Sequence, residues 1–232
     1  MRVRHPTLGG TSRKGLAMLE KLPEFLGQAL RGQRAGMANV VLRTLFARRQ
    51  VEGFTVSSTA FLHMQPLPVP YTADGLGISP PLEWRGVPEG SGCVVLIVED
   101  ADSPTPHPLV HAITVSAGGD GGLNAGALPS VDHDGSGVVI GLNSYLQHRW
   151  LPPDPPPGHG SHRYAFQCFA LRDRPAFSAG LGRHELVEAV LDRAVAAGCL
   201  VGLYERAQRQ KMRDANAFED TVPAEEAPAT VA

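Results

Sequence analysis

The stretch CVVLIVEDADSPTPHPLVHAITV, residues 93–115, decides the fold. Its first part, CVVLIV, is continuously apolar, which is typical of a β-strand buried on both faces. The prolines of SPTPHP cannot continue a central strand, so they predict a rigid loop, after which LVHAITV returns as a second strand. Asp100 and Asp102 therefore lie at the mouth of a loop at a sheet edge, with the same facing if the chain stays extended there.

Charge is distributed unevenly along the 232 residues. The net charge is −2, but residues 1–50 carry ten basic and two acidic residues, which gives 10 − 2 = +8. The rest of the chain has 21 − 10 = 11 basic and 23 − 2 = 21 acidic residues, which gives −10. This shift predicts a basic helical extension at 1–50, a β-rich domain at 51–207 and a polar tail at 208–232 that is disordered at its end.

Two short helices are predicted in the extension. Apolar residues recur at helical spacing in 16–30 and in 37–49. We expect these helices to pack on the main domain or across a homodimer contact. The alternative is a basic amphipathic segment, 16–49, that lies on an anionic membrane surface.

The rest of the composition favours a reduced cytoplasmic setting. The start of the chain has no clean apolar stretch before Lys14, so a secretory signal is not expected. No apolar run is long enough for a membrane-spanning helix. The three cysteines lie in apolar stretches at wide spacing, which fits neither a disulfide framework nor a cysteine-based zinc site.

From Phe54 onward the sequence has short β-type runs separated by turn residues, such as RYAFQCFAL and CLVGLY. One amphipathic helix interrupts them, predicted at 184–198 with Gly198 as its C-cap. These patterns predict a mainly β sandwich with a helix close to its C-terminal end.

A second dense stretch, WLPPDPPPGHGSHRY at 150–164, predicts a stiff proline-rich wall. His159 and His162 could join the two aspartates around a metal, although a proline-rich loop cannot supply helical i, i+3 geometry. A hydrolase would need an activated nucleophile. Ser103 and Ser161 are available, but neither lies in a Gly-x-Ser-x-Gly elbow.

Four motifs, in this order, resemble the signatures of the phosphatidylethanolamine-binding protein family. They are D74GLGISPPLEW84, V98EDADSPTPHPLVHAI113, the proline loop ending in H162RY164, and G202LYER206. The similarity spans about 54–206 and is strongest with the bacterial members, often described as Raf-kinase-inhibitor-like.

This resemblance implies a sandwich of two antiparallel sheets with a small anion-accepting pocket at one end. The implied pocket residues are Asp100, Asp102, Pro104, His111, His162 and Tyr164, with Trp84 and the loop Pro153 to Pro156 as walls. Ordinary core packing is the alternative for Tyr164 and Trp84, and capping of loop amides is the alternative for the two aspartates. Arg163 should point to the opposite side of its strand, in a structural role.

Two positions depart from the pattern of the bacterial members. Ala112 stands where they commonly have Trp, and Pro152 stands where they commonly have Gly. The pocket is therefore expected to be wider, and Pro152 offers no backbone amide to an anion.

A carboxylate that faces a phosphate needs a balancing charge. In one arrangement, the ligand is zwitterionic, as in phosphoethanolamine, and its ammonium meets Asp100 while His111, His162 and Tyr164 donate to the phosphate. In the other, an aspartate keeps a histidine protonated toward a simple anion. Both arrangements predict tighter phosphate binding at mildly acidic pH.

We therefore expect a non-enzymatic binding module for a small phosphorylated or anionic ligand, without a cofactor, a metal or a nucleic-acid partner. The resemblance also implies regulation of a protein partner, a kinase or a protease. The alternative is a hydrolase or metal-dependent enzyme that uses Asp100, His111 and His162.

Overall fold

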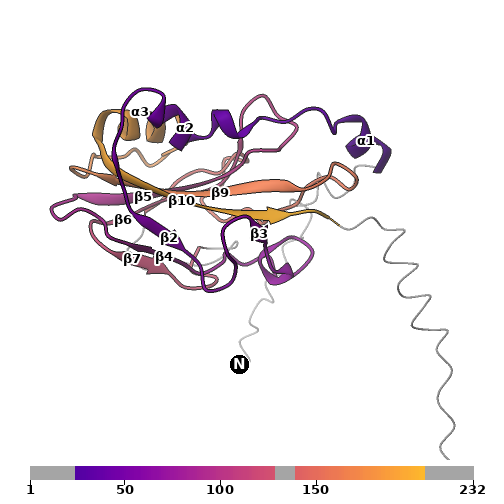
Figure 1. Cartoon of the computed structure of the whole chain (residues 1–232), viewed down its shortest axis with the longest axis horizontal. Helices are drawn as coiled ribbons and strands as arrows, with labels where there is room; N and C mark the ends of the chain where they lie inside the picture. The colour runs from indigo at the N-terminus through magenta and orange to yellow at the C-terminus, as the bar shows by residue number, and fades with distance from the viewer. Residues whose placement is uncertain (1–23, 129–138, 207–232) are drawn as a thin grey trace, which may run out of the picture.

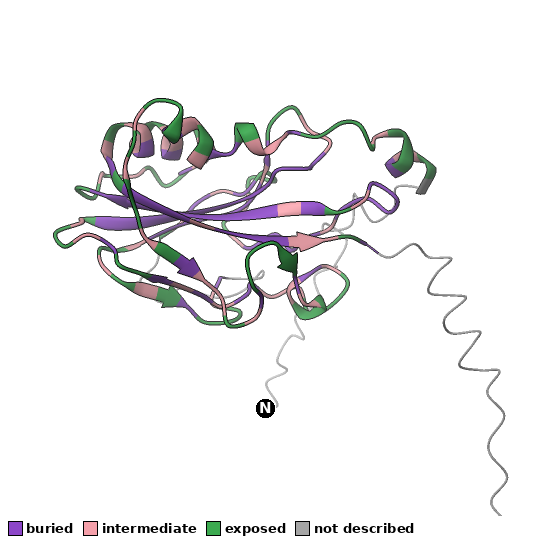
Figure 2. Ribbon diagram, viewed as in Figure 1, coloured by how far each residue is buried: buried purple, intermediate pink, exposed green. Residues whose placement is uncertain are grey.

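The computed structural model describes residues 24–128 and 139–206. These residues form three layers: helices cover one face of a large central sheet, and a smaller sheet covers the other face (Figure 1). The central strands are buried along most of their length (Figure 2). The mainly β, two-sheet architecture predicted from the sequence is confirmed.

The large sheet contains seven strands within the described residues. β5 (Cys93–Asp100) lies at its centre, and every residue of this strand is buried, as its continuous apolar run predicts. The sheet order is β1 (Glu52–Gly53), β10 (Ala194–Tyr204), β9 (His162–Leu171), β5, β6 (Leu109–Ala117) and β8 (Val139–Ile140), with β3 (Gln65–Pro66) beside β10.

The predicted antiparallel sandwich has one parallel edge. The pairs formed among β5, β6, β9 and β10 are antiparallel, whereas β1 and β3 both pair with β10 in parallel. Each parallel partner is two residues long, so β1 and β3 use two short stretches of the β10 edge instead of forming a hairpin with it.

The smaller sheet encloses the main core against the large one. It consists of β2 (Thr55–Ser57), β4 (Leu82–Arg85) and β7 (Gly121–Leu123) in the order β2-β4-β7. Trp84, on β4, is only 2% exposed and packs in this core, where its indole nitrogen donates to the Gly119 carbonyl at 3.2 Å.

The opposite face of the large sheet is covered by helices. The described helices and 3-10 turns are α1 (Glu24–Ala29), η1 (Met37–Asn39), α2 (Val41–Phe46), η2 (Val69–Tyr71) and α3 (Arg183–Arg193). Val41 and Leu45 of α2 share a second apolar core with Leu186 and Val190 of α3 and with the outer face of β5.

A buried carboxylate connects both helices to the sheet. Glu99, fully buried on β5, accepts a hydrogen bond from the Val41 amide at 2.9 Å, from the Gln167 side chain at 2.8 Å and from the Arg183 guanidinium at 2.7 Å. Its charge is therefore balanced by Arg183, and it satisfies a free amide at the start of α2.

The helix predicted at 184–198 is shorter in the structure. α3 ends at Arg193, and 194–198, AVAAG, begins β10 instead. A Cβ at Gly198 would lie 2.4 Å from the Phe54 carbonyl oxygen, so this part of β10 lies against the chain that leads into β2. Close backbone packing and pairing with β9 override the helix propensity of alanine.

The basic extension packs on the main domain where it is described, through α2 and the segment that precedes it. Of the helix predicted at 16–30, the part before Glu24 lies outside the described residues, as does the tail predicted at 208–232. In the described ranges, no helix combines the length and the apolar character that a membrane crossing requires.

The close approach at Gly198 yields a stability prediction. Gly198→Ala is expected to lower the free energy of unfolding by about 1 to 3 kcal/mol, because the added methyl group overlaps the Phe54 backbone. Gly53→Ala is the matched control, since a Cβ at Gly53 meets no atom within 4 Å. Urea unfolding measures both variants, and equal stability of the two would contradict the packing described here.

Candidate functional site

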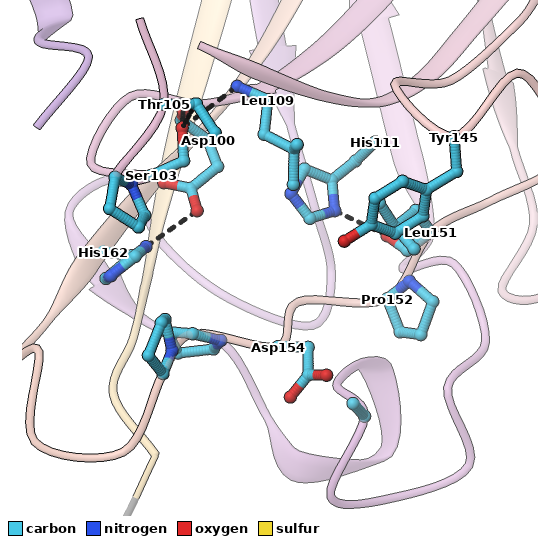
Figure 3. Close-up of a pocket in the computed structure, with 14 residues that line it drawn as sticks. Asp100, Ser103, Thr105, Leu109, His111, Tyr145, Leu151, Pro152, Asp154 and His162 are labelled. Carbon is cyan, nitrogen blue, oxygen red and sulfur yellow. Dashed lines mark hydrogen bonds and ion pairs between the residues drawn. The ribbon is translucent and has the colours of Figure 1, made fainter. Parts of the chain in front are cut away.

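A cavity of about 150 Å³ lies where β5 ends and β6 and β9 begin (Figure 3). Its walls come from the turn after β5, from the start of β6, from the loops that precede β9 and from one residue of the 72–75 turn. The lining residues are Ala73, Asp100, Ser103, Pro104, Thr105, Leu109, His111, Tyr145, Leu151, Pro152, Asp154, Pro155, Pro156 and His162.

Strand pairing brings the polar residues of this cavity together. Asp100, the last residue of β5, pairs with Leu109 on β6 and with Tyr164 on β9. His111 and His162 each lie two residues from these partners, so their side chains reach the same end of the sheet. Figure 3 shows Asp100 and His162 on one side of the cavity and His111 on the other.

Asp100 is buried, and each of its two carboxylate oxygens has one hydrogen-bond partner. One carboxylate oxygen, Oδ1, accepts the Asp102 amide at 2.8 Å, and Oδ2 lies 2.7 Å from Nδ1 of His162. The loop-capping role considered for the aspartate pair is therefore real for Asp100, and it coexists with a position on the cavity wall.

His162 and His159 continue the hydrogen-bonded chain away from the cavity. Nε2 of His162 lies 2.7 Å from Nδ1 of His159, and Nε2 of His159 lies 2.8 Å from the Leu30 carbonyl oxygen. Both histidines are fully buried, and burial lowers the pKa of His159. Both ring nitrogens of His162 are thus occupied by protein partners.

His111 presents an acceptor. Its Nδ1 lies 2.6 Å from the Leu151 carbonyl oxygen, so Nδ1 carries the hydrogen. Burial lowers the pKa of His111, with Asp100 acting in the opposite direction, so the ring is neutral at pH 7. Nε2 then carries a lone pair, and it has no hydrogen-bond partner among the described residues.

Asp102 does not lie on the cavity, contrary to the sequence prediction. β5 ends at Asp100, so the two-residue alternation of a strand no longer applies at Asp102. Its carboxylate forms a bidentate pair with Arg163 at 2.6 and 2.7 Å and a further ion pair with Arg34 at 3.0 Å. Arg163 has the structural role expected of it.

Three other predicted site residues do not line the cavity. Tyr164 is fully buried beside it, with its ring 5.2 Å from that of His111 and 6.4 Å from that of His162. Trp84 belongs to the core between the sheets, the alternative considered for it. Pro153 is buried but is not a wall residue, whereas Pro104, Pro155 and Pro156 are walls as predicted.

Sequence reasoning missed several wall residues. Asp154 stands within the proline loop, where it pairs with Arg206 at 2.5 Å, and Arg206 also pairs with Asp74 at 2.8 Å. Tyr145 and Ala73 come from loops that carried no signal. In the sequence, the only sign of a role for Asp154 was that it is an acidic residue between prolines.

The sequence also matches the profile of a known protein family. The sequence profile described as phosphatidylethanolamine-binding protein matches residues 57–205, which is more than half of the chain. The chain belongs to the phosphatidylethanolamine-binding protein family. The family suggested by the four motifs is confirmed by this match.

Bacterial and archaeal proteins are among the relatives of this family member. A UPF0098 protein of Aquifex aeolicus is 32% identical over 152 residues, covering 65% of this chain and 88% of the relative. A UPF0098 protein of Chlamydia trachomatis is 31% identical over 163 residues, covering 65% and 98%. The bacterial branch suggested by the motifs is thereby confirmed.

Two solved structures have the same fold. The crystal structure of a phosphatidylethanolamine-binding protein homolog from Chlamydia trachomatis matches with a TM-score of 0.60 and 31% identity, over 67% of this chain and 99% of that one. E. coli YbcL, described as a member of the mammalian family, matches with a TM-score of 0.61 and 23% identity, over 66% and 99%. The second likeness concerns the fold alone.

The two departures from the family pattern have different positions. Pro152 is a wall residue of the cavity and donates no amide there, as expected. Ala112 is buried between the sheets in the same apolar core as Trp150, and it is not a wall residue of the cavity. Ala112 therefore does not change the width of the cavity by direct contact with it.

Two of the groups considered for metal or hydrolytic chemistry, Asp100 and His162, are hydrogen-bonded to each other. Residues 24–128 and 139–206 contain no cluster of three histidine, cysteine or acidic side chains placed to hold a metal ion. Ser103 Oγ lies 3.2 Å from the Asp100 carbonyl oxygen and 2.7 Å from the Thr105 hydroxyl, and it accepts the Leu109 amide. This hydroxyl therefore stabilises the turn.

The Asp102 ion pairs predict a specific acid sensitivity. Burial alone would raise the pKa of Asp102, but hydrogen bonds from Arg163 and Arg34 lower it to about 2. Between its ordinary value of 3.8 and about 2, the unfolded chain binds a proton that the folded chain does not. This carboxylate therefore stabilises the fold above pH 3.8, and the contribution is lost as the pH falls to about 2.

Asp102→Asn is expected to lose about 2 to 3 kcal/mol of unfolding free energy at neutral pH, and the gap to the wild type is expected to close toward pH 2. Asp192→Asn, on the exposed face of α3, serves as the control and should show no such pH-dependent gap. Denaturant titrations at a series of pH values measure both. A gap for Asp102→Asn that is constant with pH would refute this account.

Proposed function

We propose that this protein is a non-enzymatic binding module that holds a small head group by its ammonium end, with phosphoethanolamine as the representative ligand. The ammonium would lie between the Asp100 carboxylate and Nε2 of His111. One observation carries the proposal: these two buried polar groups on the cavity wall are both hydrogen-bond acceptors.

The donors of the cavity support this orientation. His162 uses both ring nitrogens on Asp100 and His159. The Thr105 hydroxyl donates to the His107 carbonyl, and Ser103 is engaged within the turn. A buried anion would therefore find few free N–H or O–H groups on these walls, whereas an ammonium, which has three donors, complements the acceptors.

The size of the cavity favours a head group over a whole lipid. A closed cavity of about 150 Å³ is known to hold a molecule the size of benzene. Pockets for drug-sized ligands are about 300 to 1,000 Å³. A phosphate attached to the ammonium by a short chain would extend toward Tyr145, which is 41% exposed and has its hydroxyl as a donor.

An ion-pair network lies beside the cavity. Asp154 pairs with Arg206, which also pairs with Asp74. The Arg206 pairs hold the proline loop against the 72–75 turn.

The alternative arrangement, in which a protonated histidine donates to a simple anion, needs a second proton on His111. Burial lowers the pKa of this histidine, so the arrangement requires acidic solution. The enzyme alternative is tested by incubating purified protein with a phosphate monoester and a carboxylic ester, together with metal analysis. Turnover or stoichiometric zinc would overturn the proposal.

A protein partner, a membrane contact and a homodimer contact are further proposals, and none of them rests on the cavity. The family resemblance suggests a kinase or protease partner, and a cytoplasmic location is the setting in which such a partner would be met. A peripheral membrane contact or a homodimer contact would use the basic extension, on which Phe25 and Phe46 are exposed.

Asp100→Asn tests the proposed ligand contact. The affinity for phosphoethanolamine, measured by calorimetry at pH 7, is expected to fall roughly 10- to 100-fold, because a charge-assisted hydrogen bond is worth about 1.5 to 3 kcal/mol. Asp192→Asn is the matched control and should bind like the wild type. Unchanged binding by a folded Asp100→Asn protein would refute the assignment.

The pH dependence of binding distinguishes the ammonium end of the ligand from its phosphate end. Burial lowers the pKa of His111, so its ring is protonated only in acidic solution, where the binding of ethanolamine should weaken because the ring loses its lone pair and gains charge. Binding of inorganic phosphate should strengthen over the same range, because the ring becomes a donor. Calorimetry from about pH 8 to about pH 5 measures both. Phosphate that binds more tightly than ethanolamine at pH 8 would refute the proposed orientation.

A further inference from the structure

The segment 24–36, called here the N-terminal arm, lies outside the residues that match the family profile, 57–205. It nevertheless packs on both loops that carry the site. In Figure 1, α1, the first part of the arm, lies beside the loop that leads into β9. The arm therefore lies outside the matched part of the chain, and it contacts the loop that carries His159, beside the cavity.

On the loop before β9, the arm makes four polar contacts. The Leu30 carbonyl oxygen lies 2.8 Å from Nε2 of His159, and Arg31 donates to the Gly158 carbonyl at 3.0 Å. Arg34 donates to the carbonyls of Ser161 at 2.9 Å and of His159 at 3.2 Å.

On the turn after β5, the arm makes three more. The Ala35 amide donates to the Ser103 carbonyl at 3.0 Å, and the Gly36 amide donates to the Ala101 carbonyl at 2.6 Å. The Arg34 guanidinium pairs with Asp102 at 3.0 Å. One short segment thus joins the loop of His162 to the turn of Asp100.

The Leu30 carbonyl determines the direction of the hydrogen bonds that follow. A carbonyl oxygen only accepts, so Nε2 of His159 carries the hydrogen. His159 is buried and neutral, so its Nδ1 has a lone pair and accepts from Nε2–H of His162. The bond between Nδ1 of His162 and Asp100 then requires one further proton. The Asp100–His162 pair holds that proton in addition to the one on Nε2.

Without the Leu30 acceptor, the opposite direction becomes available. His159 could carry its hydrogen on Nδ1 and donate it to Nε2 of His162. His162 would then need only the hydrogen that it donates to Asp100, and the pair would hold one proton fewer. The charge of the cavity wall would become more negative by one unit.

We propose that the N-terminal arm is a functional part of the binding site: the Leu30 carbonyl positions His159 and thereby keeps the additional proton on the Asp100–His162 pair. The charge with which the wall meets a ligand is then determined by a segment that the family profile does not include. The charged and titratable groups that face this pair are His111, His159, Tyr164, and Asp102 with Arg34 and Arg163.

Two glycines of the arm allow a matched test in the full-length protein. A Cβ at Gly27 would lie 2.1 Å from the Pro157 carbonyl oxygen, whereas a Cβ at Gly32 meets no atom within 4 Å. Gly27→Ala should therefore displace the arm from the loop, although alanine in a helix is normally favourable. Gly32→Ala is the control, since it changes the same residue type without the overlap.

The first readout is the protonation of the imidazole nitrogens by ¹⁵N NMR at pH 7, without ligand. In the wild type and in Gly32→Ala, His159 is expected as the Nε2–H tautomer and His162 with both nitrogens protonated. In Gly27→Ala, His159 should shift to the Nδ1–H tautomer and His162 should lose one proton. A wild-type His162 without a hydrogen on Nε2, or an identical pattern in Gly27→Ala, would overturn the inference.

Arg34→Gln provides a second route if Gly27→Ala does not fold. It removes the contacts to the loop and to Asp102, while Arg163 continues to pair with Asp102. Arg43→Gln, an exposed change on α2, is the control. The same loss of one proton from His162 is expected for Arg34→Gln alone, and an unchanged pattern would count against the arm.

The ligand consequence rests on the proposed function and is measured separately. Ethanolamine should bind roughly tenfold more tightly to Gly27→Ala than to Gly32→Ala, because its ammonium meets a more negative wall. If the NMR pattern is as expected but ethanolamine binds to neither protein, the proposed ligand fails and the role of the arm stands. If ethanolamine binds but the NMR pattern is the same in all proteins, the role of the arm fails.

Discussion

The pairing of β5 with β6 on one side and with β9 on the other is the constraint on which the site depends. Asp100 lies at the end of this central strand, opposite Leu109 and Tyr164. A shift of register by one residue would exchange Glu99, which pairs in the helical layer, with Asp100 on the cavity wall, and would leave a buried carboxylate without its partners. The same register brings His111 and His162 to the carboxylate, so core packing and site geometry have one origin.

Two buried carboxylates that are near neighbours in the chain have different functions. Glu99 faces the helical layer, where Arg183 and backbone and amide groups of α2 and β9 satisfy it. Asp100 faces the cavity and is balanced by His162, a group whose charge depends on its proton. Glu99, in its structural role, thus pairs with the permanently charged Arg183, whereas Asp100, on the cavity wall, pairs with the titratable His162.

Much of the site could be predicted from the sequence because the signals were local. The apolar run before Asp100 predicted a strand end, and the prolines predicted rigid walls, which Pro104 and Pro155 supply. The placement of Asp102 could not be predicted, since it depends on where β5 ends and on Arg163, 61 residues later. Tyr145 and Ala73 were missed because they come from loops without a distinctive pattern.

The sequence by itself determined the fold class, the family and the order of the motifs, because hydrophobic runs and turn residues act over a few neighbouring positions. It misjudged 194–198, whose alanines favour a helix until the close approach of Phe54 and pairing with β9 select a strand. Only the tertiary structure decided which ring nitrogens donate and which accept. That pattern depends on a carbonyl at Leu30, 129 residues away from His159, and no local property of either segment specifies their contact.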